Sequence, residues 1–391
     1  AEDGIRDSST SRGLGDVYKR QMKPLEKILR PELMEIPPYN TGLGLNEVKS
    51  RYGITAVAKL SSNENPTGPA PQVLECLSQT SSELYLYPDS EALLLRKAIA
   101  RRLNVSEKRI IFGNGSEELI SIICRSVVNP GDQVVTLYPS FPLHEDYTKL
   151  MGGSVERLAI NDKLRIDLTK LIERAAQPAK LLIFANPMNP SGSWLNPEQL
   201  KQLFAAKHPE TMLVLDEAYH EYAVHGNYTS GLDLTELIPG HWVVLRTFSK
   251  SWGLAGLRIG FGICSSTELC QALDRTRTPF NTNQLAQIAA KAALDHEDYM
   301  LHSVQQTILQ RERLAKELRS RGYQVGESLG NFLFININHS SIKFAEELLK
   351  LGTIVKPWLQ PGFDSFLRVS IGTPAENEKF LVDLDQIEAF R

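Results

Sequence analysis

The sequence predicts an α/β fold in which a large domain holds a mostly parallel sheet covered by helices, and a smaller α+β domain follows. Short apolar runs alternate with helical stretches through the middle of the chain, which is typical of parallel strands joined by crossover helices. Polar and glycine-rich turns follow these runs, as expected at the edge where open sheets bind ligands. The 391 residues leave room for roughly two hydrophobic cores.

The composition argues against several kinds of partner. A formal net charge of −3 gives no basic surface for nucleic acid or an anionic membrane. No apolar run approaches the roughly 20 residues that span a bilayer. The four cysteines, Cys76, Cys124, Cys264 and Cys270, form neither a CxxC pair nor a metal-ligand spacing with histidine. We therefore expect no metal site and a reducing, cytoplasmic compartment.

We divide the chain into four parts. Residues 1–21 are polar, lack the apolar core of a signal peptide and are interpreted as a foreign or disordered leader, with Met22 as the natural start. Residues 22–60 form an N-terminal arm that contributes to the small domain, with a short amphipathic helix before an extended Pro/Gly segment at 36–42. Residues 61–285 form the large domain and 286–391 the small one.

The predicted elements follow in chain order. Helices are expected at 72–82 and 90–103, where apolar residues recur on one face. Strands of the large domain are expected at the apolar runs 110–112, 134–137, 181–184, 212–215, 243–245 and 261–263. One or two long helices at 283–322 lead out of the large domain. The small domain is predicted to contain strands at 332–336 and 367–371 and helices at 343–351 and 376–390.

A lysine in the turn after the run 243–245 is the first candidate for chemistry. Lys250 is preceded by Thr247 and Ser249 and followed by Arg258. One interpretation is an ordinary surface lysine on a polar loop. The other, which we favour, follows from its place at the exit of a buried strand, where partial desolvation lowers the pKa of an amine and makes it nucleophilic toward a carbonyl. Hydroxyls and an arginine are groups that hold a phosphate. The turn therefore predicts a site for a phosphorylated aldehyde such as pyridoxal 5'-phosphate (PLP).

A second turn offers a phosphate site. The sequence GNGSEE at 113–118 follows a strand and opens an apolar helix, so free backbone N–H groups and the positive end of the helix dipole favour an anion. The same residues would also serve only to cap the helix. Because Arg258 is expected in the same sheet, we interpret the turn as a phosphate cradle.

Three polar residues at neighbouring strand ends suit a pyridine ring. Asp216 would either cap the next helix or hold the ring nitrogen protonated, so that the ring accepts electrons from a carbanion. Tyr219 and Asn186 would reach the phenolic oxygen of the same ring.

Two further residues have a structural and a functional interpretation. Phe141 is either a core aromatic or a ring stacked on the cofactor. Arg368 lies in an apolar strand of the small domain, where it would form an ion pair with an acid or grip a substrate carboxylate or phosphate.

Taken together, these residues resemble the fold-type I PLP-dependent aminotransferases, and within them the histidinol-phosphate aminotransferases. The resemblance extends from Met22 to the C-terminus. It is carried by Pro38-Tyr39, SNENP at 62–66, Tyr87-Pro88, GNGSEE at 113–118, NPMNPSG at 186–192, DEAY at 216–219, Ser249-Lys250, GLAGLR at 253–258, Asn331-Phe332 and Leu367-Arg368.

The resemblance implies a role for each matching residue. Lys250 would join the cofactor and later shuttle a proton, Asp216 would hold the pyridinium nitrogen, and Tyr219 would share the ring oxygen with Asn186. The phosphate would be held by Gly115, Ser116, Glu117, Thr247, Ser249 and Arg258, with Tyr87 reaching it from the partner of a homodimer. The substrate would be bound by Tyr39, Asn65, Asn331, Lys356 and Arg368.

The chain departs from the family pattern at three positions. Met188 stands where the family usually has Asn, and Ser191 where it has Thr. Lys356 stands where the family has an Arg that binds the substrate's anionic group, and a lysine cannot form the same planar fork. The substrate is therefore less closely defined than the cofactor.

Three functions remain in view. The favoured one is transfer of the amino group of histidinol phosphate to 2-oxoglutarate in histidine biosynthesis. The second is another PLP reaction on the same fold, either threonine-phosphate decarboxylation or aromatic amino-acid transamination. The third, the PLP domain of a transcriptional regulator, would need a basic helix-turn-helix domain upstream, and no such pattern precedes residue 62.

Overall fold

The computed structural model describes residues 25–38, 40, 42–80 and 84–389, so the predicted leader and Tyr39 lie outside the described part of the chain. The chain divides into two units, 1–40 and 41–391, which we treat separately. In the first unit, two 3-10 turns, η1 (Leu25–Lys27) and η2 (Pro31–Glu35), replace the predicted amphipathic helix. Arg30 is extended, with ψ at 135°, because the proline that follows disfavours helical backbone before it.

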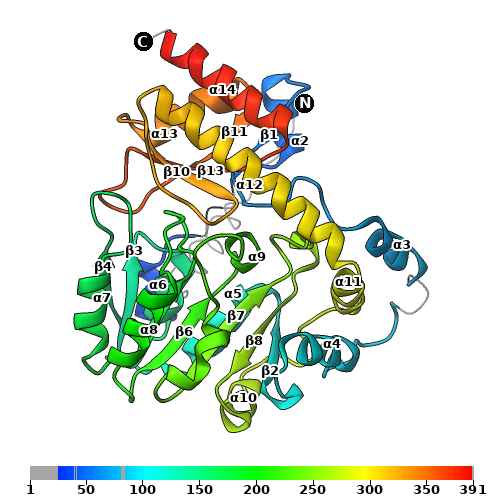
Figure 1. The fold of residues 1–391 in the computed structure, drawn as a ribbon, viewed down its shortest axis with the longest axis vertical. Coiled ribbons are helices and arrows are strands. Elements are labelled where there is room, and N and C mark those ends of the chain that lie inside the picture. Colours follow the sequence, from blue (N-terminus) through cyan, green and yellow to red (C-terminus); the bar gives the residue numbers. More distant parts are fainter. Residues whose placement is uncertain (1–24, 39, 41, 81–83, 390–391) are drawn as a thin grey trace, which may run out of the picture. The chain divides into compact units, whose positions relative to one another are not determined.

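A seven-stranded sheet forms the large part of the second unit (Figure 1). Its strand order is β2-β8-β7-β6-β5-β3-β4, in which β8 runs antiparallel to β2 and β7 and the other pairs are parallel. The strands are β2 (Ile110–Gly113), β3 (Gln133–Tyr138), β4 (Ser154–Ala159), β5 (Leu181–Ala185), β6 (Met212–Asp216), β7 (Trp242–Thr247) and β8 (Gly260–Cys264). The six predicted runs are therefore all strands, and β4 is an additional one.

Except on the half-exposed edge strand β4, alternate residues of the strands face two different hydrophobic cores. On β6, Leu213 and Leu215 belong to one core, and Met212 and Val214 to the other. Burial of both faces explains why these strands have nearly continuous apolar sequences. The first core also contains residues of α4 (Leu93–Leu103), α7 (Leu168–Ala175), α8 (Pro197–Ala206) and α11 (Gln284–Asp295), and the second contains residues of α5 (Gly115–Val127) and α10 (Thr267–Asp274).

Shorter elements complete this part of the molecule. They are α3 (Pro71–Gln79), η4 (Glu107–Arg109), α6 (Pro142–Leu150), α9 (His220–Ala223), η5 (Gly231–Leu237) and η6 (Ala255–Leu257).

The C-terminal region forms a separate four-stranded antiparallel sheet, β12-β13-β10-β9. Its strands are β9 (Gln324–Val325), β10 (Phe332–Asn336), β12 (Lys356–Pro357) and β13 (Phe366–Ser370), covered by α13 (Ser341–Lys350) and α14 (Pro374–Ala389). Further upstream lie α2 (Leu45–Tyr52) and β1 (Ala58–Lys59), which pairs in parallel with β11 (Thr353–Ile354).

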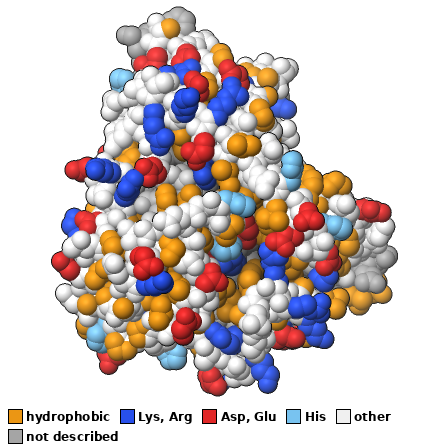
Figure 2. Space-filling view, in the orientation of Figure 1, with side chains coloured by type: hydrophobic (Ala, Val, Ile, Leu, Met, Phe, Trp, Pro, Cys, Tyr) orange, Lys and Arg blue, Asp and Glu red, His pale blue; other side chains and the backbone are white. Residues whose placement is uncertain are grey.

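The long helix α12 (Glu297–Ser320) connects the two cores (Figure 1). Met300 and Val304, near its start, lie in the core of the large sheet, whereas Leu314 and Leu318 lie in the core of the small one. Among the described helices, none combines the length and apolar character needed to cross a bilayer. Basic and acidic side chains are interspersed over the described face shown in Figure 2.

Candidate functional site

Lys250 lies in the turn after β7, at the edge of the sheet where the parallel strands end. Its Nζ donates a hydrogen bond to the Ser62 carbonyl oxygen at 3.0 Å and lies 5.9 Å from the centre of the Tyr219 ring. Burial, and then the positive charge of Arg368, lowers the pKa of Lys250 to about 7. A large fraction of this amine is therefore neutral near pH 7, which is the form that attacks a carbonyl carbon.

Asp216 is the last residue of the neighbouring strand β6, and its carboxylate is buried. Oδ1 accepts a hydrogen bond from the Ala218 N–H at 3.1 Å, while Oδ2 lies 3.5 Å from His144 Nε2. The next helix, α9, begins only at His220 and has Tyr219 at its cap position, so Asp216 does not cap it. The buried carboxylate is thus available to a cationic ring nitrogen.

His144 is a residue that the sequence analysis missed. It is buried on α6, and its ring meets Phe141 edge-on at 5.7 Å as well as approaching Asp216. The packing of helix α6 brings His144 to the carboxylate of Asp216, which is 72 residues away along the chain. The sequence signal that could have predicted His144 as a site residue was its position one helical turn after Phe141. Phe141 itself is half-buried at the start of α6, beside these two residues.

Asn186 and Tyr219 lie in the turns that follow the neighbouring strands β5 and β6, at the same edge of the sheet. The Asn186 Oδ1 accepts a hydrogen bond from the Leu195 N–H at 2.9 Å, and its buried Nδ2 has no partner among the described residues. The Tyr219 hydroxyl accepts a hydrogen bond from Asn63 Nδ2 at 3.0 Å. Asn63, which we did not predict as a site residue, is itself held by Ser370 Oγ at 2.8 Å from its backbone nitrogen.

Two predicted substrate residues hold the backbone around this site. Asn65 Nδ2 donates to the Ser251 carbonyl at 2.8 Å, next to Lys250, and its Oδ1 accepts from Ser303 Oγ at 3.0 Å. Asn331 Nδ2 donates to the Asn63 carbonyl at 2.9 Å. Both amides therefore position the segment that carries Ser62 and Asn63.

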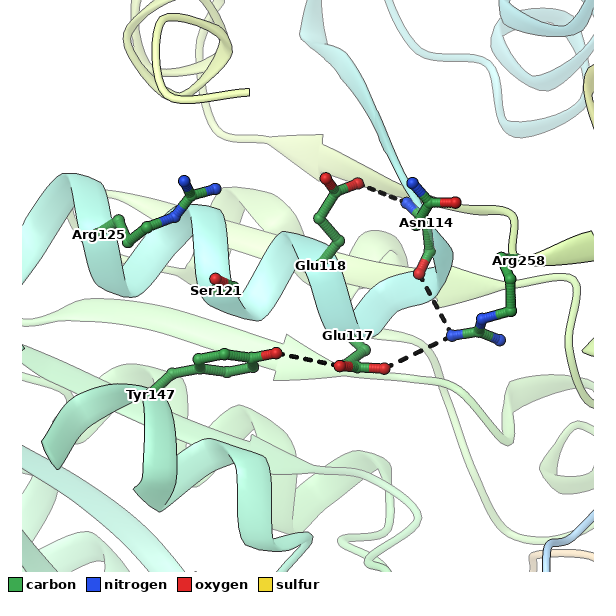
Figure 3. Close-up of a pocket in the computed structure, with 7 residues that line it drawn as sticks. All are labelled: Asn114, Glu117, Glu118, Ser121, Arg125, Tyr147 and Arg258. Carbon is green, nitrogen blue, oxygen red and sulfur yellow. Dashed lines mark hydrogen bonds and ion pairs between the residues drawn. The ribbon is translucent and has the colours of Figure 1, made fainter. Parts of the chain in front are cut away.

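The predicted phosphate cradle comes together at the start of α5 (Figure 3). Arg258 donates to the Asn114 carbonyl at 3.3 Å and to Ser249 Oγ at 3.4 Å, and Ser249 Oγ accepts from Thr247 Oγ1 at 3.0 Å. Gly115 has a φ of +77°, and a Cβ there would lie 2.8 Å from the Arg258 guanidinium. The positive φ favours glycine at this position, and a side chain there would also have to displace the Arg258 guanidinium.

The cradle opens onto a cavity of about 460 Å³. The cavity is lined by Asn114, Glu117, Glu118, Ser121, Arg125, Tyr147 and Arg258 (Figure 3).

Two cations lie side by side on the small sheet. Lys356 on β12 is the register partner of Arg368 on β13, so both side chains point to one face. Arg368 donates to Asn189 Oδ1 at 3.0 Å and to the Ser61 carbonyl at 2.5 Å, both neutral acceptors. Burial, and then Arg368, lowers the pKa of Lys356 to about 8. Such a pair of cations favours an anionic ligand.

Comparison with known proteins identifies the family. A model described as aminotransferase class I and II matches residues 55–384. The chain belongs to the class I and II aminotransferases. It is 49% identical over 361 residues to histidinol-phosphate aminotransferase 3 of Rhizobium meliloti, covering 92% of this chain and 98% of that protein. It is 50% identical over 367 residues to histidinol-phosphate aminotransferase 1 of Mesorhizobium japonicum, covering 94% and 100%.

A solved aminotransferase has the same fold. The crystal structure of histidinol-phosphate aminotransferase from Sinorhizobium meliloti in complex with PLP superposes with a TM-score of 0.82 at 29% identity, covering 93% of this chain and 98% of that one. The predicted family, fold class and transaminase activity are confirmed by these matches. They also support the predicted cofactor.

The residues of this aminotransferase fit PLP. The glycine-lined cradle at Arg258 has the donors for a phosphate, the unpartnered Nδ2 of Asn186 is free to donate to a ring oxygen, and Lys250 provides a neutral amine. Tyr87 lies apart from them at the surface, where the residue is 82% exposed and its ring stacks on Phe280 at a centroid distance of 4.7 Å. Tyr39 is outside the described residues.

Proposed function

We propose that this aminotransferase transfers the amino group of histidinol phosphate to 2-oxoglutarate, giving imidazole-acetol phosphate and glutamate, as a step of histidine biosynthesis. The reaction type is supported by one observation above the others, which is the desolvated amine of Lys250 at the same sheet edge as the Asp216 carboxylate. The choice of substrate is supported by the names of both relatives.

Lys250 acts as nucleophile and then as base. PLP, when bound, supplies an aldehyde carbon and a ring that accepts the electrons of the substrate's Cα–H bond. Lys250 would hold the cofactor through its neutral Nζ, and once freed by the substrate's amine the same nitrogen would take the proton from the substrate carbon. The Ser62 carbonyl accepts a hydrogen bond from this amine at 3.0 Å and so fixes its position in the site.

The other residues orient the ring and its phosphate. Asp216 would face the ring nitrogen and keep it protonated, with His144 beside its second oxygen. Asn186 and Tyr219 would hold the ring oxygen, and Phe141 would cover one face of the ring. The phosphate would receive the N–H groups of Gly115, Ser116 and Glu117 at the start of α5 together with Arg258, Ser249 and Thr247.

The substrate's anionic group would be recognised by Arg368 and Lys356. Because they are cross-strand neighbours, their two positive charges lie on one face of the small sheet. Arg368 is also close enough to Lys250 to lower the pKa of that lysine. Asn65 and Asn331 would complete the proposed substrate site by positioning the 61–66 segment.

A homodimer is the proposed assembly. The segment around Tyr87 is unusually apolar for a surface, since Leu84, Tyr85, Leu86 and Tyr87 are 54%, 85%, 54% and 82% exposed. A second copy packed on this segment would bury it and bring Tyr87 to the partner's phosphate cradle. The cytoplasmic location expected from the cysteines stays a prediction.

The proposal is tested by spectroscopy and by a substrate panel. Purified protein loaded with PLP should absorb in the visible and bleach when glutamate is added, and Lys250→Ala should lower turnover by about a thousandfold or more. The panel compares histidinol phosphate with phenylalanine, tyrosine and threonine phosphate. Faster turnover of an aromatic amino acid, or carbon dioxide release from threonine phosphate, would favour one of the two alternatives instead.

A further inference from the structure

A carboxylate faces the guanidinium of the phosphate cradle. Glu117 Oε2 lies 3.5 Å from Arg258 Nη2, and Figure 3 shows the two side chains approaching one another across the start of α5. The side chains are 43% and 42% exposed. An acid at this place is unexpected, because a phosphate bound to Arg258 would carry the same sign of charge.

Tyr147 holds the same carboxylate from the other side. Its hydroxyl donates to Glu117 Oε1 at 3.0 Å from helix α6 (Figure 3). Burial, and then the charge of Glu117, raises the pKa of Tyr147 above its usual value, so the hydroxyl stays protonated and remains a donor. Glu117 therefore keeps one hydrogen-bond donor even when it is not paired with Arg258.

The adjacent acid has a different role. Glu118 Oε2 accepts from the Asn114 backbone nitrogen at 2.6 Å and from Asn281 Nδ2 at 2.7 Å. Glu118 thus holds the turn that begins the cradle. The carboxylate of Glu117, by contrast, contacts the side chains of Arg258 and Tyr147. Replacing Glu117 therefore leaves the hydrogen bonds of Glu118 to the turn in place.

We propose that Glu117 is an exchangeable counter-ion of the cradle, which pairs with Arg258 in the cofactor-free enzyme and gives way to the cofactor phosphate while staying bonded to Tyr147. This inference rests on the proposed function and concerns how tightly the cofactor is held. A half-exposed ion pair is weak and easily displaced. Because the displaced carboxylate still faces the phosphate, Glu117 lowers the affinity for the cofactor and favours its exchange.

The test measures binding to the cofactor-free full chain. Glu117→Gln should bind PLP about two- to fivefold more tightly than the wild type at low salt, with the difference shrinking as salt screens the charges. Inorganic phosphate, used as a competitor, should show the same change, whereas pyridoxal, which has no phosphate, should bind both proteins equally. Glu198→Gln removes the same charge at an exposed site on α8 and should change nothing.

A double substitution separates exchange from mere charge removal. Tyr147→Phe should weaken PLP binding, because the Glu117 carboxylate, once displaced from Arg258, then also lacks the Tyr147 hydroxyl as a hydrogen-bond donor. This effect of Tyr147→Phe should vanish when Glu117→Gln is also present. Unchanged or weaker binding of PLP by Glu117→Gln, with normal binding by the wild type, would overturn the inference. A wild type that does not bind PLP would instead refute the proposed function.

Discussion

At the scale of single residues, the protonation of Lys250 decides when the cofactor can be captured. An ordinary lysine has a pKa of about 10.4 and is almost fully charged at pH 7. Here burial and the charge of Arg368 lower the pKa to about 7. The neutral, nucleophilic fraction therefore rises as the pH increases through about 7 rather than through about 10.

We predict that the rate of PLP capture by cofactor-free enzyme follows this titration. Stopped-flow absorbance between pH 6 and 9 should give a half-maximal rate near the pKa of about 7. Arg368→Gln removes the second cause of the shift, so its midpoint should move to higher pH. A wild-type rate that still climbs steeply above pH 9 would show that Lys250 is not desolvated.

A second titration is expected at Lys356. Its pKa is lowered to about 8, so its positive charge is lost as the pH rises through 8 and the affinity for an anionic substrate falls with it. We predict that kcat/KM for histidinol phosphate declines above pH 8. Lys356→Arg should remove this decline, because a guanidinium stays charged. Parallel pH profiles for the two proteins would exclude Lys356 from substrate binding.

At the scale of an element, the turn 247–258 is held by close backbone contacts. Gly253 has a φ of +73°, and a Cβ there would lie 2.5 Å from the Gly68 carbonyl carbon. Asn65 adds a hydrogen bond to the Ser251 carbonyl at 2.8 Å. The Lys250 turn and the 65–69 segment are therefore packed as one body, which positions the amine.

We predict that Gly253→Ala disrupts this packing, whereas Gly256→Ala in the same turn does not. The first change forces a side chain against backbone at a positive φ and should cost at least about 2 kcal/mol, seen as a lower urea midpoint. A Cβ at Gly256 meets nothing within 4 Å. Equal midpoints for the two variants would mean that the turn adapts freely.

At the scale of the whole molecule, the proposed dimer makes each active site depend on two chains. If Tyr87 completes the partner's phosphate cradle, then in a mixed dimer of a Tyr87→Ala chain and a Lys250→Ala chain both substitutions fall in the same site. One site of each hybrid would combine an intact Lys250 with an intact Tyr87.

We predict that mixing the two inactive variants restores activity. Unfolding and refolding them together should give roughly a quarter of wild-type activity, because half of the dimers are hybrids with one intact site of two. Refolding each variant alone is the control. No recovery, in a mixture that light scattering shows to be dimeric, would place Tyr87 outside the partner's site.

The burial of a strand decides whether its sequence predicts it. β5, β6 and β7 were predictable because both faces of each are buried, which produces unbroken apolar runs. β4 lies at the edge of the sheet, pairs with β3 and is half-exposed, so its sequence carries no such run. In the N-terminal arm, the sequence pattern predicted a helix, but Pro31 keeps Arg30 extended and so separates two short turns.

The sequence by itself determined the family, six of the seven strands of the central sheet and the residues that follow them, because strand burial and turn chemistry depend on residues that are neighbours along the chain. Only the tertiary structure brought His144 to Asp216, Asn63 to Tyr219, and Glu117 between Arg258 and Tyr147. Each of these contacts joins separate elements across the fold. Their geometry depends on how helices pack on the sheet, and that packing leaves no periodic signal in the sequence.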